Sequence, residues 1–191
     1  MVGKRRRQFV DLHPELEMVA ACDRRFQEER EDEDGIRLHT DIHGLLAESL
    51  DLLIVCLPND VAPDATIAGL QRGLHVLCEK PPGRDLSDMA RVAAAAADHP
   101  AQKLKYGFNH RYHHSVQRAL ELVRSDALGR IINLRGVYGK SAIINFESDW
   151  RTKRSVAGGG ILLDQGIHMV DLLRLFAGEF DEVKSFVSND Y

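Results

Sequence analysis

The densest group of chemically active side chains lies between residues 164 and 171. Asp164, His168 and Asp171 are spaced i, i+4 and i+7, so on a helix they would share one face. An imidazole exchanges protons near neutral pH, and a nearby carboxylate can orient it or a bound hydroxyl. Leucine, isoleucine and valine flank these residues, and charges in such an apolar helix need partners or a ligand. The pattern predicts either a general base with an orienting carboxylate or a purely structural Asp164–His168 pair.

A second candidate is Lys80, in the sequence Cys78-Glu79-Lys80-Pro81-Pro82. It follows a short apolar run that we predict to be a buried strand, and in open α/β sheets the carboxyl ends of strands border the ligand crevice. Pro81 restricts Lys80 to an extended conformation and permits a cis bond, and either would aim the ammonium in one direction. A cationic Lys80 would stabilise a developing alkoxide, whereas a neutral one could act as the base. The alternative is a surface lysine in a turn.

Alternating strands and helices are predicted to position these residues. We expect helices over 2–13, 24–34, 42–49, 60–72 (capped by Asp60) and 85–99 (begun by Asp85), and extended segments over 16–22, 36–39, 52–57, 75–78 and 103–107. Strand and helix alternate throughout, which predicts an α/β fold with a Rossmann-like, doubly wound parallel sheet.

The regular alternation of predicted strands and helices ends after residue 107, where we predict a domain boundary. Residues 1–107 would form the α/β domain, and residues 108–191 the start of an α+β domain. In the second domain we expect helices over 115–125 and 162–176. Strands over 131–138 and 182–187 would form an open antiparallel sheet with an unpaired edge and exposed apolar side chains.

Composition narrows the function classes. A chain of 191 residues with 44% hydrophobic content and net charge −4 is typical of a globular protein, and its basic run at 4–7 reads as a solvated helix face, so we expect no nucleic-acid partner. No apolar run approaches ~18 residues and no secretory signature is visible, so we expect a cytoplasmic protein without a membrane partner. Each cysteine (22, 56 and 78) closes an apolar run, which predicts small core residues instead of a metal or disulfide set.

Further motifs carry a family resemblance. They are Leu57-Pro58-Asn59-Asp60, Gly107-Phe108-Asn109-His110-Arg111-Tyr112, Asp149-Trp150-Arg151 and the glycines 158–160. In this order, and together with the residues around Lys80 and His168, the chain resembles the glucose-fructose oxidoreductase and inositol dehydrogenase (Gfo/Idh/MocA) family over nearly its whole length. The resemblance implies NAD(P)-dependent hydride transfer to or from a sugar, inositol or nucleotide sugar in carbohydrate metabolism, by a full-length homo-oligomer.

The same resemblance implies roles for individual residues. Lys80, Asp164 and His168 would be catalytic. The nicotinamide side of the cofactor, or the substrate beside it, would be contacted by Pro58, Asn59, Glu79, Lys80, Asn109, Trp150 and Arg151. Asp23 ends a predicted strand, where a carboxylate accepts hydrogen bonds from the adenine ribose and favours NAD. Arg24 and Arg25 beside it could accommodate the 2′-phosphate of NADP, so both cofactors stay open.

The beginning of the sequence departs from the family pattern. A G-x-G-x-x-G turn should follow the first strand of a dinucleotide-binding fold, yet only Gly3 can match it, as the third glycine. We therefore expect a sheet that lacks its first strand and two of the glycines that hold a pyrophosphate.

Three other functions remain open. Asp164, His168 and Asp171, with the histidines 110, 113 and 114, offer ligand types for a metal-dependent hydrolase, although no H-E-x-x-H motif supports one and we expect no metal site. The missing glycine loop would also suit a non-catalytic remnant. NAD-dependent glycoside hydrolysis occurs within the resembled family, and these motifs are compatible with it.

Overall fold

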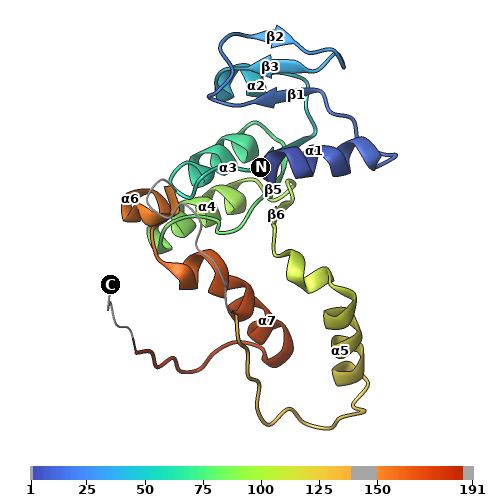
Figure 1. Ribbon diagram of the computed structural model, residues 1–191, viewed down its shortest axis with the longest axis vertical. Coiled ribbons are helices and arrows are strands. Elements are labelled where there is room, and N and C mark those ends of the chain that lie inside the picture. Colours follow the sequence, from blue (N-terminus) through green and yellow to red (C-terminus); the bar gives the residue numbers. More distant parts are fainter. Residues whose placement is uncertain (1, 139–149, 187–191) are drawn as a thin grey trace. The chain divides into compact units, whose positions relative to one another are not determined.

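The computed structural model describes residues 2–138 and 150–186, and Figure 1 traces their elements in order. The described chain forms two compact units. Residues 2–107 together with 150–160 make up the first unit, and residues 108–138 together with 161–186 make up the second. Residues 150–160 thus pack with the first unit although they lie far beyond residue 107 in the sequence.

The first unit contains two three-stranded sheets. One is parallel throughout, in the order β4 (Leu52–Val55), β5 (His75–Cys78) and β6 (Leu104–Tyr106). In the other, β1 (Ala20–Cys22) runs parallel to β3 (Arg37–His39), and β2 (Arg30–Glu31) runs antiparallel to β3. The predicted α/β, Rossmann-like architecture is confirmed. A sheet in two pieces agrees with the expected lack of its first strand.

Four longer helices belong to the first unit: α1 (Val2–Leu12), α2 (Ile42–Ala47), α3 (Ala62–Gln71) and α4 (Leu86–Asp98). Asp85 caps α4 as predicted, because its side chain accepts a hydrogen bond from the Asp88 N–H at 3.0 Å. Asp60 does not cap α3. Val61 occupies the cap position without a side-chain hydrogen bond, and Pro63 in the first turn has no N–H that needs one.

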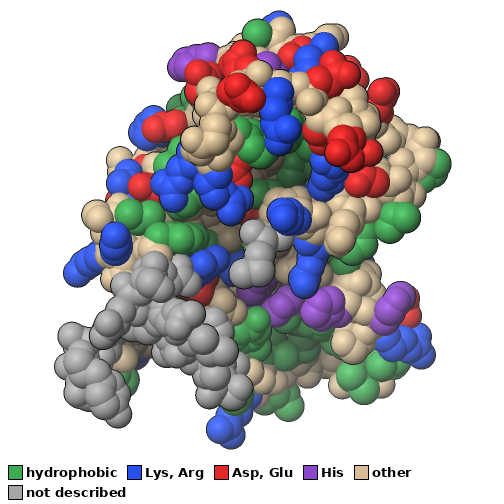
Figure 2. Space-filling view, turned by 45° about the horizontal axis from the view of Figure 1, so that its top comes forward, with side chains coloured by type: hydrophobic (Ala, Val, Ile, Leu, Met, Phe, Trp, Pro, Cys, Tyr) green, Lys and Arg blue, Asp and Glu red, His purple; other side chains and the backbone are tan. Residues whose placement is uncertain are grey.

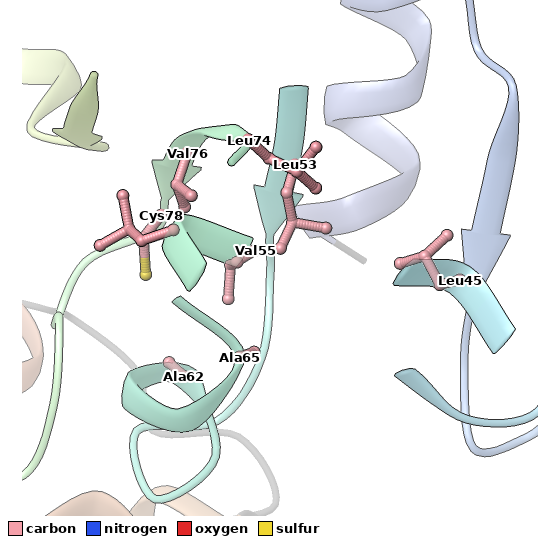
Figure 3. Close-up of a cluster of buried hydrophobic side chains, with 9 residues drawn as sticks. Leu45, Leu53, Val55, Ala62, Ala65, Leu74, Val76 and Cys78 are labelled. Atoms are coloured by element: carbon pink, nitrogen blue, oxygen red, sulfur yellow. The ribbon is translucent and has the colours of Figure 1, made fainter. Parts of the chain in front are cut away.

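The core of the first unit lies between β4, β5 and α3. Figure 3 shows side chains of these three elements gathered together, among them Val55, Val76 and Cys78, which are at most 3% exposed. Small residues let α3 approach the sheet closely: a Cβ at Gly69 would lie 2.8 Å from Leu53 Cδ2. Val55 and Cys78 end their strands, so the core fixes the points at which the next loops leave the sheet. Of the cysteines, only Cys78 is fully buried.

The charged segment 24–34 is not the helix that the sequence predicted. It bends and then contributes β2. Asp32 Oδ1 accepts hydrogen bonds from the backbone N–H groups of Asp34 and Ile36, both at 3.0 Å, and Gly35 has φ +78°. Such side-chain bonds to the backbone compete with helical hydrogen bonds, so the chain reverses here and enters β3.

Arginines of α1 form ion pairs within the first unit. Arg7 contacts Asp32 at 3.2 Å and Asp34 at 2.5 Å, and Arg6 pairs with Glu79. Figure 2 likewise shows basic and acidic side chains interspersed on the face in view. Half of the basic run at 4–7 is therefore matched by carboxylates.

The second unit consists of helices and extended chain in its described part. It contains η1 (Asn109–Tyr112), α5 (His114–Arg124), the π-helical turn η4 (Leu162–Gly166) and α7 (Ile167–Ala177), which confirms the predicted helices. The expected strands are not formed over 131–138 and 182–186, and residue 187 lies outside the described residues. A strand needs a neighbouring backbone to bond, and no described segment of this unit supplies one; Ile132 and Phe186 are accordingly 97% and 102% exposed. None of the helices in the described ranges has the length and apolar character that a membrane span needs.

Candidate functional site

The ends of the parallel strands bring several predicted site residues to one edge of a sheet. Val55, Cys78 and Tyr106 occupy matching positions at the ends of β4, β5 and β6. The ladder continues past them, since the Glu79 N–H donates to the Val55 carbonyl at 2.9 Å and the Gly107 N–H donates to the Cys78 carbonyl at 2.8 Å. The segments that hold residues 58–59 and 79–80 therefore leave the sheet side by side. This edge is where open α/β sheets bind their ligands.

Lys80 and Glu79 leave β5 at this edge with different surroundings. The Lys80–Pro81 bond is cis, one of the two conformations that the sequence left open, and Lys80 is half-buried. The Glu79 carboxylate accepts a hydrogen bond from Arg6 Nε of α1. It also lies against the end of β6, because a Cβ at Gly107 would be 2.7 Å from Glu79 Oε2. Glu79 thus links α1, β5 and β6.

Asn59 fastens a distant part of the chain to the end of β4. It is 4% exposed, and its Nδ2 donates to the carbonyl of Ala157 at 2.8 Å. Ala157 ends α6 (Arg154–Ala157), which follows η3 (Trp150–Thr152). Asn59 therefore holds the segment that precedes the glycines 158–160, a role that the sequence did not suggest.

Arg84 holds the same segment from the loop after β5. Its Nη1 donates to the Ser155 carbonyl at 3.4 Å, and its Nε and Nη2 donate to the buried Asp88 at 2.9 and 3.1 Å. Gly158 lies directly on Arg84: its φ is +79°, and a Cβ would be 2.5 Å from Arg84 Cα. Sequence reasoning missed this cluster. The spacing i, i+4 of Arg84 and Asp88 was the available signal.

Asp23 follows β1 and is bound by Arg25. The Arg25 side chain reaches both carboxylate oxygens, at 2.5 Å from Nη2 and 3.0 Å from Nε, and its backbone N–H donates at 3.0 Å. The Arg25 side-chain hydrogen bond is the largest cause that lowers the pKa of Asp23 to about 2. Of the two arginines predicted beside Asp23, Arg25 is therefore the one that binds its carboxylate.

Gly3 lies in the first turn of α1. A Cβ there would be 3.8 Å from Cys56 Cβ, so this turn contacts the residue that follows β4. This is an ordinary van der Waals distance, so α1 packs beside the end of β4 without requiring a glycine at this position. With polar residues at the ends of β1, β4 and β5, the residues present fit a nicotinamide dinucleotide.

Trp150 and Arg151 form a contact of their own in η3. The Arg151 guanidinium carbon lies 4.4 Å from the centroid of the Trp150 ring, a cation–π arrangement. Both belong to the first unit, whereas Asn109 begins η1 in the second. Asp149, from the same motif, lies outside the described residues.

Asp171 of the predicted polar stripe is held by an arginine. Arg111 Nε and Nη2 donate to the two Asp171 oxygens at 2.8 and 2.5 Å, which joins η1 to α7. Asp171 is only 8% exposed. Within residues 2–138 and 150–186, no group of three or more potential metal ligands is gathered. Because Asp171 already has a cationic partner, the metal-dependent hydrolase loses one of its proposed ligands.

Aromatic rings enclose His168, which is 4% exposed. The His110 ring stacks on it with centroids 3.9 Å apart and 13° between planes. Phe108 meets it edge-on at 6.2 Å, and Tyr138 lies at 6.1 Å. On the face shown in Figure 2, histidine side chains lie side by side next to hydrophobic ones. His168 is therefore held in an aromatic setting that its neighbours in sequence do not supply.

Asp164 precedes His168 in the π-helical turn η4 and accepts a hydrogen bond from Gln165 Nε2 at 2.9 Å. The expected helix over 162–176 thus begins with a wider turn, a feature that is frequent at functional sites. Of the three residues expected to be catalytic, Lys80 belongs to the first unit, and Asp164 and His168 belong to the second.

Two family models together match most of the chain. Residues 1–108 match the model described as "Oxidoreductase family, NAD-binding Rossmann fold", and residues 116–191 match "GFO/IDH/MocA C-terminal domain". Levoglucosan dehydrogenase of Pseudarthrobacter phenanthrenivorans is 30% identical over 96% of this chain and 45% of its own length. D-glucoside 3-dehydrogenase of Escherichia coli is 32% identical over 93% of this chain and 51% of its own length. The chain spans about half the length of these curated relatives.

Solved structures agree with these matches. Myo-inositol 2-dehydrogenase from Lactobacillus plantarum superimposes with a TM-score of 0.76 at 28% identity, covering 93% of this chain and 53% of the other. Levoglucosan dehydrogenase in complex with NADH and levoglucosan gives a TM-score of 0.70 at 29% identity, covering 75% of this chain and 39% of the other.

Proposed function

The chain belongs to the Gfo/Idh/MocA family of oxidoreductases, and on that premise we propose that the protein transfers hydride between NAD or NADP and a hydroxyl or carbonyl carbon of a sugar, inositol or nucleotide sugar. The observation that carries the proposal is the shared edge at the ends of β4, β5 and β6, where Lys80 is the second residue after β5. In this proposal residues 1–107 bind the dinucleotide. Residues 108–191 bind substrate and support assembly into a homo-oligomer.

Three side chains would carry the reaction. A bound nicotinamide supplies the hydride acceptor or donor. His168 takes the proton of the substrate hydroxyl on an imidazole nitrogen during oxidation and returns it during reduction. Lys80, as an ammonium, would stabilise negative charge that develops on the substrate, which contributes most where water is excluded. Asp164 orients the substrate hydroxyl or the imidazole.

The cofactor would be held from several elements. Gly3 would contact its pyrophosphate, and Asp23 and Arg24 its adenine ribose. The nicotinamide side would meet Pro58, Asn59, Glu79, Lys80, Asn109, Trp150 and Arg151. As a ribose-binding carboxylate Asp23 would favour NAD, and Arg25, which binds the Asp23 carboxylate, would allow NADP as well.

The setting of the enzyme is part of the proposal. The levoglucosan, D-glucoside and myo-inositol dehydrogenases named above support a role in carbohydrate metabolism. The proposed location is the cytoplasm, which the composition supports. Exposed apolar side chains in the second unit, such as Val137 and Val183 at 80% and 76%, offer surface that a homo-oligomer could bury.

The proposal is tested with the full-length protein by following NAD(P)H absorbance. Levoglucosan, a methyl glucoside and myo-inositol would each be offered with NAD and with NADP. We expect turnover with at least one combination of substrate and cofactor. Lys80→Met should lower kcat by a factor of about 10²–10³, and His168→Ala should lower it by a factor of about 10²–10⁴. Lys103→Met, at an exposed lysine just before β6, is the matched control and should keep activity.

Two results would overturn the proposal. One is a full-length protein that binds neither NAD nor NADP and turns over no member of the substrate panel. The other is a Lys80→Met variant as active as Lys103→Met. Glycoside cleavage without net NAD(P)H formation would instead favour the NAD-dependent glycosidase chemistry of the same family.

A further inference from the structure

We propose that His110 is a positioning residue that fixes the plane of the His168 imidazole. The inference rests on the proposed function, because it concerns the histidine to which that function assigns the proton. It adds a residue from η1 whose side chain has no role in the mechanism above. The reason lies in the way that the two rings meet.

The contact between the rings is face to face. Their centroids are 3.9 Å apart and their planes differ by 13°, so the rings form a close stacked pair. The nitrogen atoms of an imidazole lie in the ring plane and hydrogen-bond in that plane. Two stacked imidazoles therefore cannot hydrogen-bond to each other across their faces. His110 consequently acts on the orientation of His168 and does not exchange a proton with it directly.

An ion pair next to the stack holds the two rings in register. Arg111 follows His110 in η1, and its guanidinium makes two bonds to Asp171. Asp171 lies three residues after His168, on the same side of α7. The two hydrogen bonds from Arg111 to Asp171 therefore hold η1 against α7, one helical turn after the stacked rings. Rotation of the His168 ring would have to displace His110. The Arg111–Asp171 ion pair resists that displacement, because Arg111 is the next residue in η1.

The other rings close the remaining sides. Phe108, two residues before His110, meets the His168 ring edge-on at 88°, and Tyr138 lies at 29° to it. His110 itself also contacts Tyr138 at 5.6 Å and His113 at 4.9 Å. Of these rings, His110 is the nearest to His168. Its removal would therefore take away the ring that lies nearest to the face of His168 and free the side-chain torsions of that residue.

Three variants of the full-length protein test the inference. His110→Ala removes the ring, His110→Phe keeps a flat ring without nitrogen atoms, and His114→Ala removes an exposed histidine at the start of α5 as the control. We expect His110→Ala to lower kcat by about 10- to 100-fold with little change in KM, because misplaced catalytic groups cost rates of this order. His110→Phe and His114→Ala should stay within about 3-fold of the wild type, since neither frees the His168 ring.

A second measurement reports on His168 without turnover. In protein labelled at histidine ring carbons, the His168 signal, assigned through His168→Gln, should move or broaden in His110→Ala and stay sharp in His110→Phe. The inference is overturned if His168 is unaffected by His110→Ala, or if His110→Phe is as slow as His110→Ala, because the nitrogen atoms would then matter. If the wild type shows no dehydrogenase activity at all, the proposed function fails, and the ring signals alone decide whether His110 positions His168.

Discussion

The ion pair between Arg111 and Asp171 makes a sharp prediction about stability. Arg111→Met removes both bonds to a carboxylate whose side chain is 9% exposed, while the Arg111 side chain itself is 39% exposed. An uncompensated buried charge costs about 3–5 kcal/mol. Solvent reaches the arginine, so we take the low end, a loss of about 3 kcal/mol in the free energy of unfolding. For a chain of this length that corresponds to a melting temperature about 6–12 °C lower.

Thermal and urea unfolding of the full-length protein, followed by circular dichroism, measure this loss. Arg118→Met is the matched control, because Arg118 pairs with Glu121 at 2.9 Å on the surface of α5, with both side chains more than 60% exposed. An exposed pair of this kind contributes at most about 1 kcal/mol. The double variant Arg111→Met/Asp171→Leu should recover most of the loss, since it removes both charges together.

Two results would refute this reasoning. If Arg111→Met is no less stable than Arg118→Met, the Asp171 carboxylate does not depend on its arginine. If the double variant is as unstable as Arg111→Met alone, the loss comes from missing packing and not from an unpaired charge.

Two further predictions concern the first unit. The folded-state pKa of Asp23 lies below its unfolded value, so the stability that this carboxylate contributes is complete above about pH 4 and is lost as the pH falls towards about 2. Arg25→Gln should raise this pKa. A carboxyl NMR titration that gives the same Asp23 pKa in the wild type and in Arg25→Gln would contradict the assignment. Gly158→Ala places a Cβ 2.5 Å from Arg84 Cα at a φ of +79°, so we expect the free energy of unfolding, measured with urea, to fall by about 2 kcal/mol or more. The control is Gly160→Ala, which has open space around it and should lower the free energy of unfolding by less than half as much.

Local patterns predicted most elements of the first unit. The apolar run that contains β4 and the cap at Asp85 are set by residues adjacent in sequence, and both were found where expected. The helix predicted over 24–34 was wrong, although its charged composition suits a solvated helix. There the hydrogen bonds that backbone N–H groups donate to Asp32 outweigh helix propensity, and their geometry cannot be read from residue types.

The candidate site was predictable in its residue types but not in its contacts. Lys80 and His168 were identified from motif and context, and their roles stay predictions. The bond from Asn59 to Ala157 spans 98 residues, and the fork between Arg111 and Asp171 spans 60. Neither pair shares a local pattern, so a single sequence contains no signal that joins them. His110 likewise belongs to the motif at residues 107–112, but nothing in that motif indicates that it stacks on His168.

The return of residues 150–160 to the first unit has a consequence for how this protein can be divided. The first unit is discontinuous in sequence: a fragment that stops at residue 107 would lack the Ala157 carbonyl and leave the buried amide of Asn59 without that acceptor. It would also uncover the surface of Arg84 on which Gly158 lies. Exchange of the second unit between relatives, in the laboratory or in evolution, would therefore have to keep residues 150–160 together with residues 2–107. The first unit is thus transferred as two stretches of chain and not as one.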